Sequence, residues 1–120
     1  MTQHSLLQPQ EIEVFYIIPT LRKYLAIAMK SKGLKQKQIA SLLNIEDAAV
    51  SQYVNNKRGN KIQLSSEMQN HINKSSTLIK DKISLVKEMQ KLLKEIHDSG
   101  EMCAIHKSIS KVPSECSPEL

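Results

Sequence analysis

Apolar residues recur at helical spacing in the middle of the chain, in two short blocks separated by a turn. The blocks consist of Ile39, Ala40 and Leu43, and of Val50, Tyr53 and Val54. Asn44 stands where the first helix should end, since asparagine tolerates the left-handed conformation of a helix C-cap. Glu46 and Asp47 suit the N-terminus of the next helix. The pattern predicts two short helices joined by a tight turn, with Ile45 pointing from the turn into the core.

Two further helices are predicted before this hairpin. Pro9 can begin a short helix, because its missing N–H is not needed in the first turn. Its core-facing side would be Ile12, Phe15 and Tyr16. Pro19 is expected to interrupt this helix and start the next one. The apolar face of that next helix is Leu21, Tyr24, Leu25, Ala28 and Met29, and Gly33 is expected to end it as a C′ glycine.

The pattern continues after the hairpin with a helix that starts near Ser65 or Ser66. Ser75 and Ser76 are then expected to cap a longer helix over residues 77–97. Its apolar residues are close to a heptad seam: Ile79, Ile83, Val86, Met89, Leu93 and Ile96. Such a helix would be about 30 Å long, more than a small core needs. We expect the excess to contact a second copy; the alternative is a helix that only covers its own core.

These elements predict an all-α fold in three parts. Residues 1–61 hold the N-terminal helices and the hairpin, and residues 62–98 form a helical dimerisation region. Residues 99–120 form a partly irregular tail that contains Cys and His. A chain of 120 residues suffices for one modest core with extensions.

The outer face of the second hairpin helix carries small or hydrogen-bonding groups. It consists of Asp47, Ala48, Ser51, Gln52 and Asn55. A helix with an apolar back and a small polar front can enter a DNA major groove and read base edges. An ordinary helical hairpin with a solvated outer face would have the same spacing, so the spacing alone does not decide between the two.

The charge distribution favours nucleic acid. The chain has a formal net charge of +5, and residues 20–61 hold nine Lys and Arg against two acidic residues. Residues 62–120 hold eight basic and eight acidic residues, and residues 1–19 hold only two glutamates. The excess positive charge therefore lies on the hairpin region, as expected of a phosphate-binding surface.

Residues 20–61 resemble the helix-turn-helix of the phage-repressor-like (XRE-type) DNA-binding family. Gln36 opens the first helix, Ala40 lies where the two helices cross, and Val50 is inside the second. The exit Tyr53-Val54-Asn55 is followed by Lys57-Arg58-Gly59. The resemblance implies a repressor-like fold and a homodimeric transcription regulator that binds double-stranded DNA.

Each candidate DNA-binding residue has an expected role. The polar front would select bases, and the basic residues would supply affinity through counterion release. Gln36 is placed either to contact a phosphate or to brace the reading helix, and Asn55, Lys57 and Arg58 would flank the duplex backbone. The full set is Gln36, Asp47, Ala48, Ser51, Gln52, Asn55, Lys57 and Arg58.

Cysteine and histidine gather in the last quarter of the chain, in the order His97, Cys103, His106 and Cys116. These four groups could complete a tetrahedral zinc site, with Cys103, His106 and Cys116 as the candidate ligands. The alternative is free thiols or a degenerate remnant. This stretch is similar to the tail of an archaeal group of predicted regulators, which implies zinc or an iron–sulfur cluster and a metal or redox response.

Other features narrow the class of protein. The chain has no nucleophile–base pair, phosphate-cradling glycine loop or paired catalytic carboxylates, so no enzyme is predicted. It has no secretory leader and no apolar run long enough to span a bilayer, which predicts a cytoplasmic address and no membrane contact. The acidic pair Glu46-Asp47 leaves one alternative to DNA reading: the scaffold would serve as a protein-interaction or antitoxin-like adaptor.

Overall fold

The computed structural model describes residues 8–101 and 104–105, and its regular structure within these residues is entirely helical. The all-α class is therefore confirmed. The elements in order are α1 (Pro9–Ile12), η1 (a π-helical turn, Glu13–Ile17), α2 (Ile18–Ser31), α3 (Gln36–Leu43), α4 (Asp47–Val54), α5 (Ser66–Leu78) and α6 (Lys82–Ser99).

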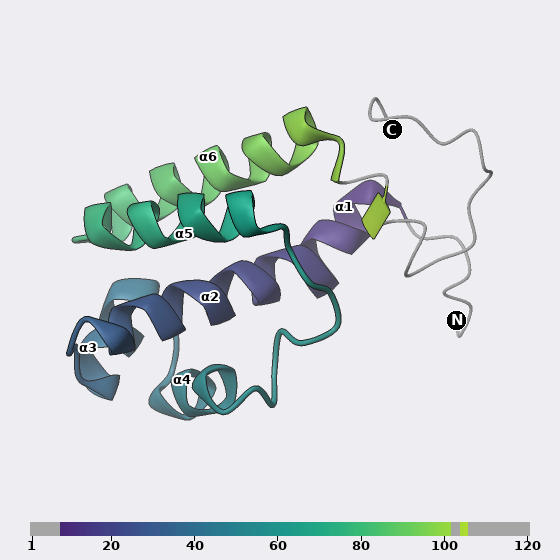
Figure 1. Ribbon diagram of the computed structural model, residues 1–120. Helices are drawn as coiled ribbons and strands as arrows, with labels where there is room; N and C mark the ends of the chain where they lie inside the picture. The colour runs from purple at the N-terminus through teal and green to yellow at the C-terminus, as the bar shows by residue number, and fades with distance from the viewer. Residues whose placement is uncertain (1–7, 102–103, 106–120) are drawn as a thin grey trace.

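Helix α2 forms the middle of the molecule (Figure 1). Helices α5 and α6 lie on one side of it and α4 lies on the other, while α3 lies at one end of α2 and contacts α2, α4 and α6. All of them bury apolar residues in one core. Ile72 of α5 and Leu92 of α6 belong to the same buried cluster as Leu21 and Leu25 of α2. The core thus crosses the boundary expected near residue 61.

Pro19 does not interrupt the helical path, contrary to expectation. The chain runs helically from Pro9 to Ser31, and Pro19 occupies the first turn of α2. Just before it the helix widens, because the Ile18 N–H donates to the Glu13 carbonyl in the five-residue π pattern. The Thr20 hydroxyl donates to the Tyr16 carbonyl at 2.7 Å, in the turn that contains the proline.

The same turn moves Phe15 out of the core. Phe15 was expected beside Ile12 on the buried face, but its side chain is 58% exposed. Ile12 and Ile17 are both fully buried instead. A π turn takes more residues per revolution than an α-turn, so positions five apart come onto one face. The expectation assumed α-helical spacing and was wrong for this residue.

The break between the last two helices also lies later than expected. Ser75 and Ser76 do not cap a helix; they are buried inside α5. The Ser76 hydroxyl donates back to the Asn73 carbonyl at 2.6 Å and contacts the ammonium of Lys32, the residue that follows α2. Both serines lie inside α5, where the backbone N–H groups bond within the helix, so there is no helix start for them to cap.

Asp81 caps α6 in place of the two serines. Its carboxylate accepts from the Ser84 N–H at 2.8 Å, and the Ser84 hydroxyl accepts from the Asp81 N–H at 2.9 Å. The bond from the Ser84 N–H and the bond from the Ser84 side chain hold the pKa of Asp81 below its ordinary value of 3.8.

We expect Asp81→Asn to change the pH dependence of stability. A lowered folded-state pKa contributes stability that is present above the unfolded pKa and lost as pH falls through the folded one. The wild type should therefore exceed Asp81→Asn in free energy of unfolding near neutral pH. The difference should shrink as pH falls below about 4. Urea unfolding near neutral pH and below about pH 4 measures this difference in the free energy of unfolding. A difference that does not change with pH would contradict the role of the cap.

The expected seam on the last helix is divided between two surfaces. Ile79, Leu93 and Ile96 are buried in the core of the chain itself. Ile83 and Val86 instead remain 69% and 59% exposed. The six residues thus do not form one stripe: the turn at residues 79–81 separates Ile79 from the other five, and the core covers only the later part of α6 on this side.

Candidate nucleic-acid interface

Helices α3 and α4 begin and end where the local signals predict. Gln38 caps the start of α3, since its side chain accepts from the Lys35 N–H at 2.8 Å. Asn44 ends α3 in the left-handed conformation at φ 56°. The Ile45 N–H then donates to the Ala40 carbonyl at 3.0 Å, which closes the turn. Glu46 is the extended residue that precedes α4.

The inner face of α4 is held in the core. Val50 and Tyr53 are each 1% exposed and pack in the same cluster as Ile39 of α3 and Leu25 of α2. Burial of an aromatic and a branched side chain fixes the rotation of so short a helix. The opposite face must therefore point away from α2, toward solvent.

The outer face carries the predicted polar front. Asp47, Ala48, Gln52 and Asn55 are exposed, and Ser51 is half-buried. The Asn55 amide donates to the Ser51 hydroxyl at 3.3 Å, which joins two of these groups along the helix. All five predicted residues thus share one accessible face of α4.

The Gln36 side chain is hydrogen-bonded to α4 and so braces that helix. Its side-chain amide donates to the Asp47 carbonyl in the first turn of α4, with Nε2 3.0 Å from the oxygen. Of the two roles considered for Gln36, the brace is therefore the one that its contacts satisfy. The bond ties the start of α3 to the start of α4 and so holds the angle between the two helices.

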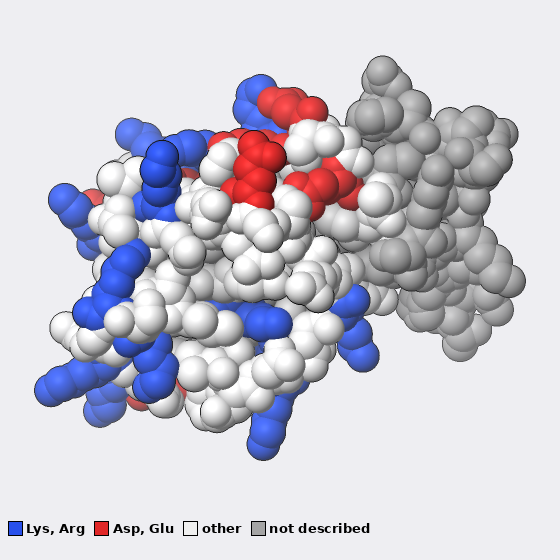
Figure 2. Space-filling model, in the orientation of Figure 1, with Lys and Arg blue, Asp and Glu red and all other residues white. Residues whose placement is uncertain are grey.

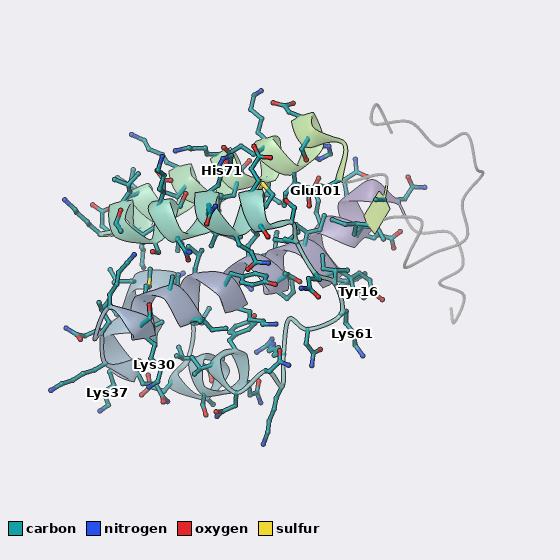
Figure 3. All side chains as sticks on the ribbon, in the orientation of Figure 1. Tyr16, Lys30, Lys37, Lys61, His71 and Glu101 are labelled. Atoms are coloured by element: carbon teal, nitrogen blue, oxygen red, sulfur yellow. The ribbon has the colours of Figure 1, made fainter. Side chains whose placement is uncertain are left out.

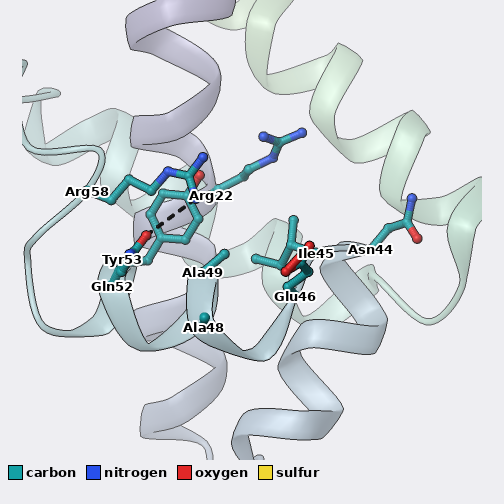
Figure 4. A pocket seen from close by; sticks show the side chains of 9 residues that line it. All are labelled: Arg22, Asn44, Ile45, Glu46, Ala48, Ala49, Gln52, Tyr53 and Arg58. Carbon is teal, nitrogen blue, oxygen red and sulfur yellow. Dashed lines mark hydrogen bonds between the residues drawn. The ribbon is translucent and has the colours of Figure 1, made fainter.

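The loop after α4 folds back so that Arg58 contacts residues of that helix. The Lys57 N–H donates to the Gln52 carbonyl at 2.8 Å, and Asn56 and Gly59 both have positive φ. The Arg58 guanidinium lies over the Tyr53 ring, 5.4 Å from its centroid, and its Nη1 is 3.5 Å from the Gln52 side-chain oxygen (Figure 4). Arg58 therefore flanks α4 at the edge of the polar front.

A second arginine faces this edge. Arg22 of α2 and Arg58 both line a hollow of about 470 Å³, with Ala48, Ala49 and Gln52 of α4 among its other walls. Figure 4 shows the two arginines above α4, with the small alanine side chains beneath them. Arg22 is one of the nine basic residues counted in 20–61, but no pattern in the sequence connects it with α4.

The opposite edge of α4 is also cationic. A hollow of about 90 Å³ there is lined by Lys30 and Gln36 together with Ser51 and Asn55. Lys37 is exposed on the adjoining α3, and Figure 3 shows it with Lys30 at the same end of the molecule. Basic side chains thus flank the polar front on both sides.

A group of acidic side chains gathers on another part of the molecule, whereas Glu46 and Asp47 stand at the start of α4 itself. Figure 2 shows most of the visible Asp and Glu over the upper side of the molecule, beside some Lys and Arg, and most of the Lys and Arg around the left and lower sides. The acidic group comes from α5, α6 and the residue that follows α6: Glu67, Glu95, Asp98 and Glu101. His71 lies among them with its Nδ1 2.9 Å from a Glu95 oxygen.

The predicted metal ligands Cys103, His106 and Cys116 fall outside the described residues. His97, which begins their pattern, has a partner already: its Nε2 is 2.7 Å from a Glu13 carboxylate oxygen of η1. Within residues 8–101 and 104–105, no three Cys, His, Asp or Glu side chains are placed to hold one metal ion. The metal site therefore stays a prediction about the tail.

Comparison with known proteins gives no relative: no family model, curated protein or solved structure matches the chain. In the part of the chain that the structure describes, no helix combines the length and the apolar character needed to cross a membrane.

Proposed function

We propose that this protein is a sequence-specific DNA-binding transcription regulator that acts as a homodimer, with α4 as its reading helix. The phage-repressor-like class is part of the proposal. One observation carries it: a small polar face on α4 is bordered by Arg22 and Arg58 on one edge and by Lys30 on the other. A helix in the major groove has a phosphate strand on each side, so cations on both edges match the duplex.

The proposed contacts divide into two kinds. Arg22, Arg58 and the lysines beside α4 would bind phosphates and supply most of the affinity. Ser51, Gln52 and Asn55 would meet base edges, because their hydroxyl and amide groups both donate and accept hydrogen bonds. No catalytic step is part of this function; the protein would act by occupying a promoter operator.

Fluorescence anisotropy with random-sequence duplex DNA, titrated across salt, tests the proposal. We expect the logarithm of the association constant to fall with the logarithm of salt at a slope equivalent to several neutralised phosphates. Absence of binding at low salt would overturn DNA recognition.

After operator selection, Ser51→Ala with Gln52→Ala should relax sequence preference by about 1–3 kcal/mol per lost base contact while nonspecific binding survives. Unchanged preference would mean that another face reads the bases.

A protein-interaction or antitoxin-like adaptor is the second candidate. Glu46 and Asp47 are exposed at the start of α4, and Glu46 lines the hollow that holds the two arginines. Carboxylates there would oppose a phosphate and favour a basic protein partner. The same anisotropy titration separates the candidates, because an adaptor would not show the steep salt slope.

A metal- or redox-responsive tail would add to the regulator rather than replace it. Cys103, His106 and Cys116 supply the soft and borderline donors that zinc or an iron–sulfur cluster uses. The metal content of the freshly purified chain is the measurement that decides this extension.

A further inference from the structure

Two adjacent apolar side chains of η1, Val14 and Phe15, remain in contact with water, each 58% exposed. Phe15 is the one phenylalanine of the chain, and phenylalanine belongs to the residues that a core most often buries. The π turn keeps this ring outside, and π turns within α-helical segments are frequent at functional sites. The exposed ring is therefore a candidate for contact with a ligand.

Phe15 lines a hollow of about 280 Å³ whose walls come from η1, the start of α2 and the loop after α4. Tyr16 adds a second aromatic side chain, and Figure 3 shows it next to Lys61. Pro19 and Gly59 also line the hollow, and neither has a long side chain that would fill it. The volume lies just below the range of about 300–1,000 Å³ that is usual for drug-sized ligands, so it suits one flat ring system.

The charged side chains at this hollow are cationic. Among the described residues that line it they are Arg58 and Lys61, and both are exposed. Glu13 of the same π turn points toward α6, where its carboxylate oxygen is 2.7 Å from the His97 Nε2. The hollow thus combines aromatic rings with positive charge, which suits an anion that also has an aromatic ring.

A nucleotide with an unpaired base has this combination. Proteins that bind single strands use cations along the phosphates and aromatic side chains on which the bases stack. In a duplex the faces of the bases are already covered by their neighbours, so a ring on the protein surface reaches only an unpaired base. An acidic peptide would satisfy the cations but would offer no flat partner to the Phe15 ring.

The hollow also adjoins the surface beside α4, because Arg58 lines both. We propose that Phe15, Tyr16, Arg58 and Lys61 bind single-stranded nucleic acid. One base stacks on the Phe15 ring, and the phosphates next to it lie at Arg58 and Lys61. This activity goes beyond the reading of duplex DNA and does not depend on it.

Fluorescence anisotropy of the full-length chain with a labelled oligothymidine of about 12 nucleotides tests the site. Phe15→Ala should weaken binding by about 5- to 150-fold, the effect of losing one base–aromatic stack. Ile83→Ala is the matched control, because Ile83 is 69% exposed on α6 and lies outside the hollow. It should bind like the wild type. Equal binding by Phe15→Ala and the wild type, or no binding by the wild type at low salt, would overturn the proposal.

An abasic strand of the same length separates stacking from charge, since it has the same phosphates without bases. The wild type should bind it about as weakly as Phe15→Ala binds oligothymidine. Lys61→Gln should weaken both strands by a similar factor, because a phosphate contact does not depend on the base. If the wild type bound both strands equally, or if oligoglutamate displaced oligothymidine as well as unlabelled oligothymidine does, the site would recognise charge alone and the proposal would fail.

Phe15→Trp gives a direct signal for stacking, because the natural chain has no tryptophan. The indole keeps an aromatic surface at this position, so oligothymidine should still bind and should quench the tryptophan fluorescence. Ile83→Trp should show no quenching. This pair of variants also answers the question if Phe15→Ala folds poorly. Equal quenching in both variants, or none in Phe15→Trp, would contradict a base on this ring.

The salt titration with duplex DNA tests the proposed function separately. Phe15→Ala should bind duplex DNA like the wild type, because paired bases are not free to stack on the ring. Loss of duplex binding with oligothymidine binding retained would overturn the proposed function alone. The reverse result would overturn the single-strand site alone.

Discussion

Gly59→Ala should destabilise the protein by about 2–5 kcal/mol, as the sum of backbone strain and a steric clash. Gly59 has φ +69°, a conformation that alanine adopts only at a cost. A Cβ at this position would lie 2.5 Å from the Pro19 carbonyl oxygen and 3.2 Å from the Lys23 Cβ. The first of these atoms belongs to the backbone of α2 and cannot move aside alone. The loop would therefore have to lift from α2.

Gly33→Ala is the matched control for this prediction. Gly33 also has positive φ, at +93°, but a Cβ there would meet no atom within 4 Å. It should lose only the strain, about 1–2 kcal/mol. Urea unfolding of the two variants isolates the clash as the difference between them. Equal destabilisation would mean that the loop after α4 does not lie against Pro19.

The same loop connects stability to the proposed DNA binding. Gly59 follows directly after Lys57 and Arg58, and its close approach to α2 helps to hold Arg58 beside Tyr53 and Gln52. If Gly59→Ala lifts the loop, the variant should also bind duplex DNA more weakly than Gly33→Ala, at temperatures where both remain folded.

Lys57→Gln with Arg58→Gln should weaken DNA binding by about one to two orders of magnitude near 0.1 M salt. Each cation that neutralises a phosphate contributes about one unit to the salt slope, so the double change should lower that slope by about two. Both residues are exposed beside the polar front of α4. The loss should be similar for all sequences, because phosphate contacts carry no base information.

Lys74→Gln with Lys91→Gln makes the same charge change on exposed positions of α5 and α6. Those helices lie across α2 from α4 (Figure 1). The control should leave the slope within about half a unit of the wild type, since exposed charges beyond the Debye length of about 10 Å are screened. Equal losses of DNA affinity in the two double variants would mean that the DNA surface lies elsewhere, or that binding depends only on the net charge of the protein.

The bounds of α3 and α4 were predictable because their signals are local. Asn44 tolerates the left-handed C-cap, and the apolar spacing of Ile39 with Leu43 and of Val50 with Tyr53 defines the inner faces. Each signal depends on residues within one or two helical turns. The exposed polar front of α4 was predictable for the same reason, because the residues that do not belong to the buried face of a helix form its outer face.

Errors arose where distant contacts or an uncommon helix type decided the outcome. Phe15 was misplaced because the π turn before Pro19 changed the helical phase. Ser76 was misread as a cap because its contact with Lys32, at the end of α2, is made only in the folded chain. Arg22 was missed as a neighbour of Arg58 because nothing in the local pattern brings α2 beside the loop after α4.

The sequence by itself determined the all-α class, the extent of α3 and α4 and the concentration of positive charge in residues 20–61, because composition and helical periodicity are properties of neighbouring residues. Only the tertiary structure decided which apolar residues of α6 enter the core and which stay exposed. It alone also placed cations on both edges of α4. Both outcomes depend on how helices far apart in the chain pack against α2, and packing selects among faces that the periodicity leaves equivalent.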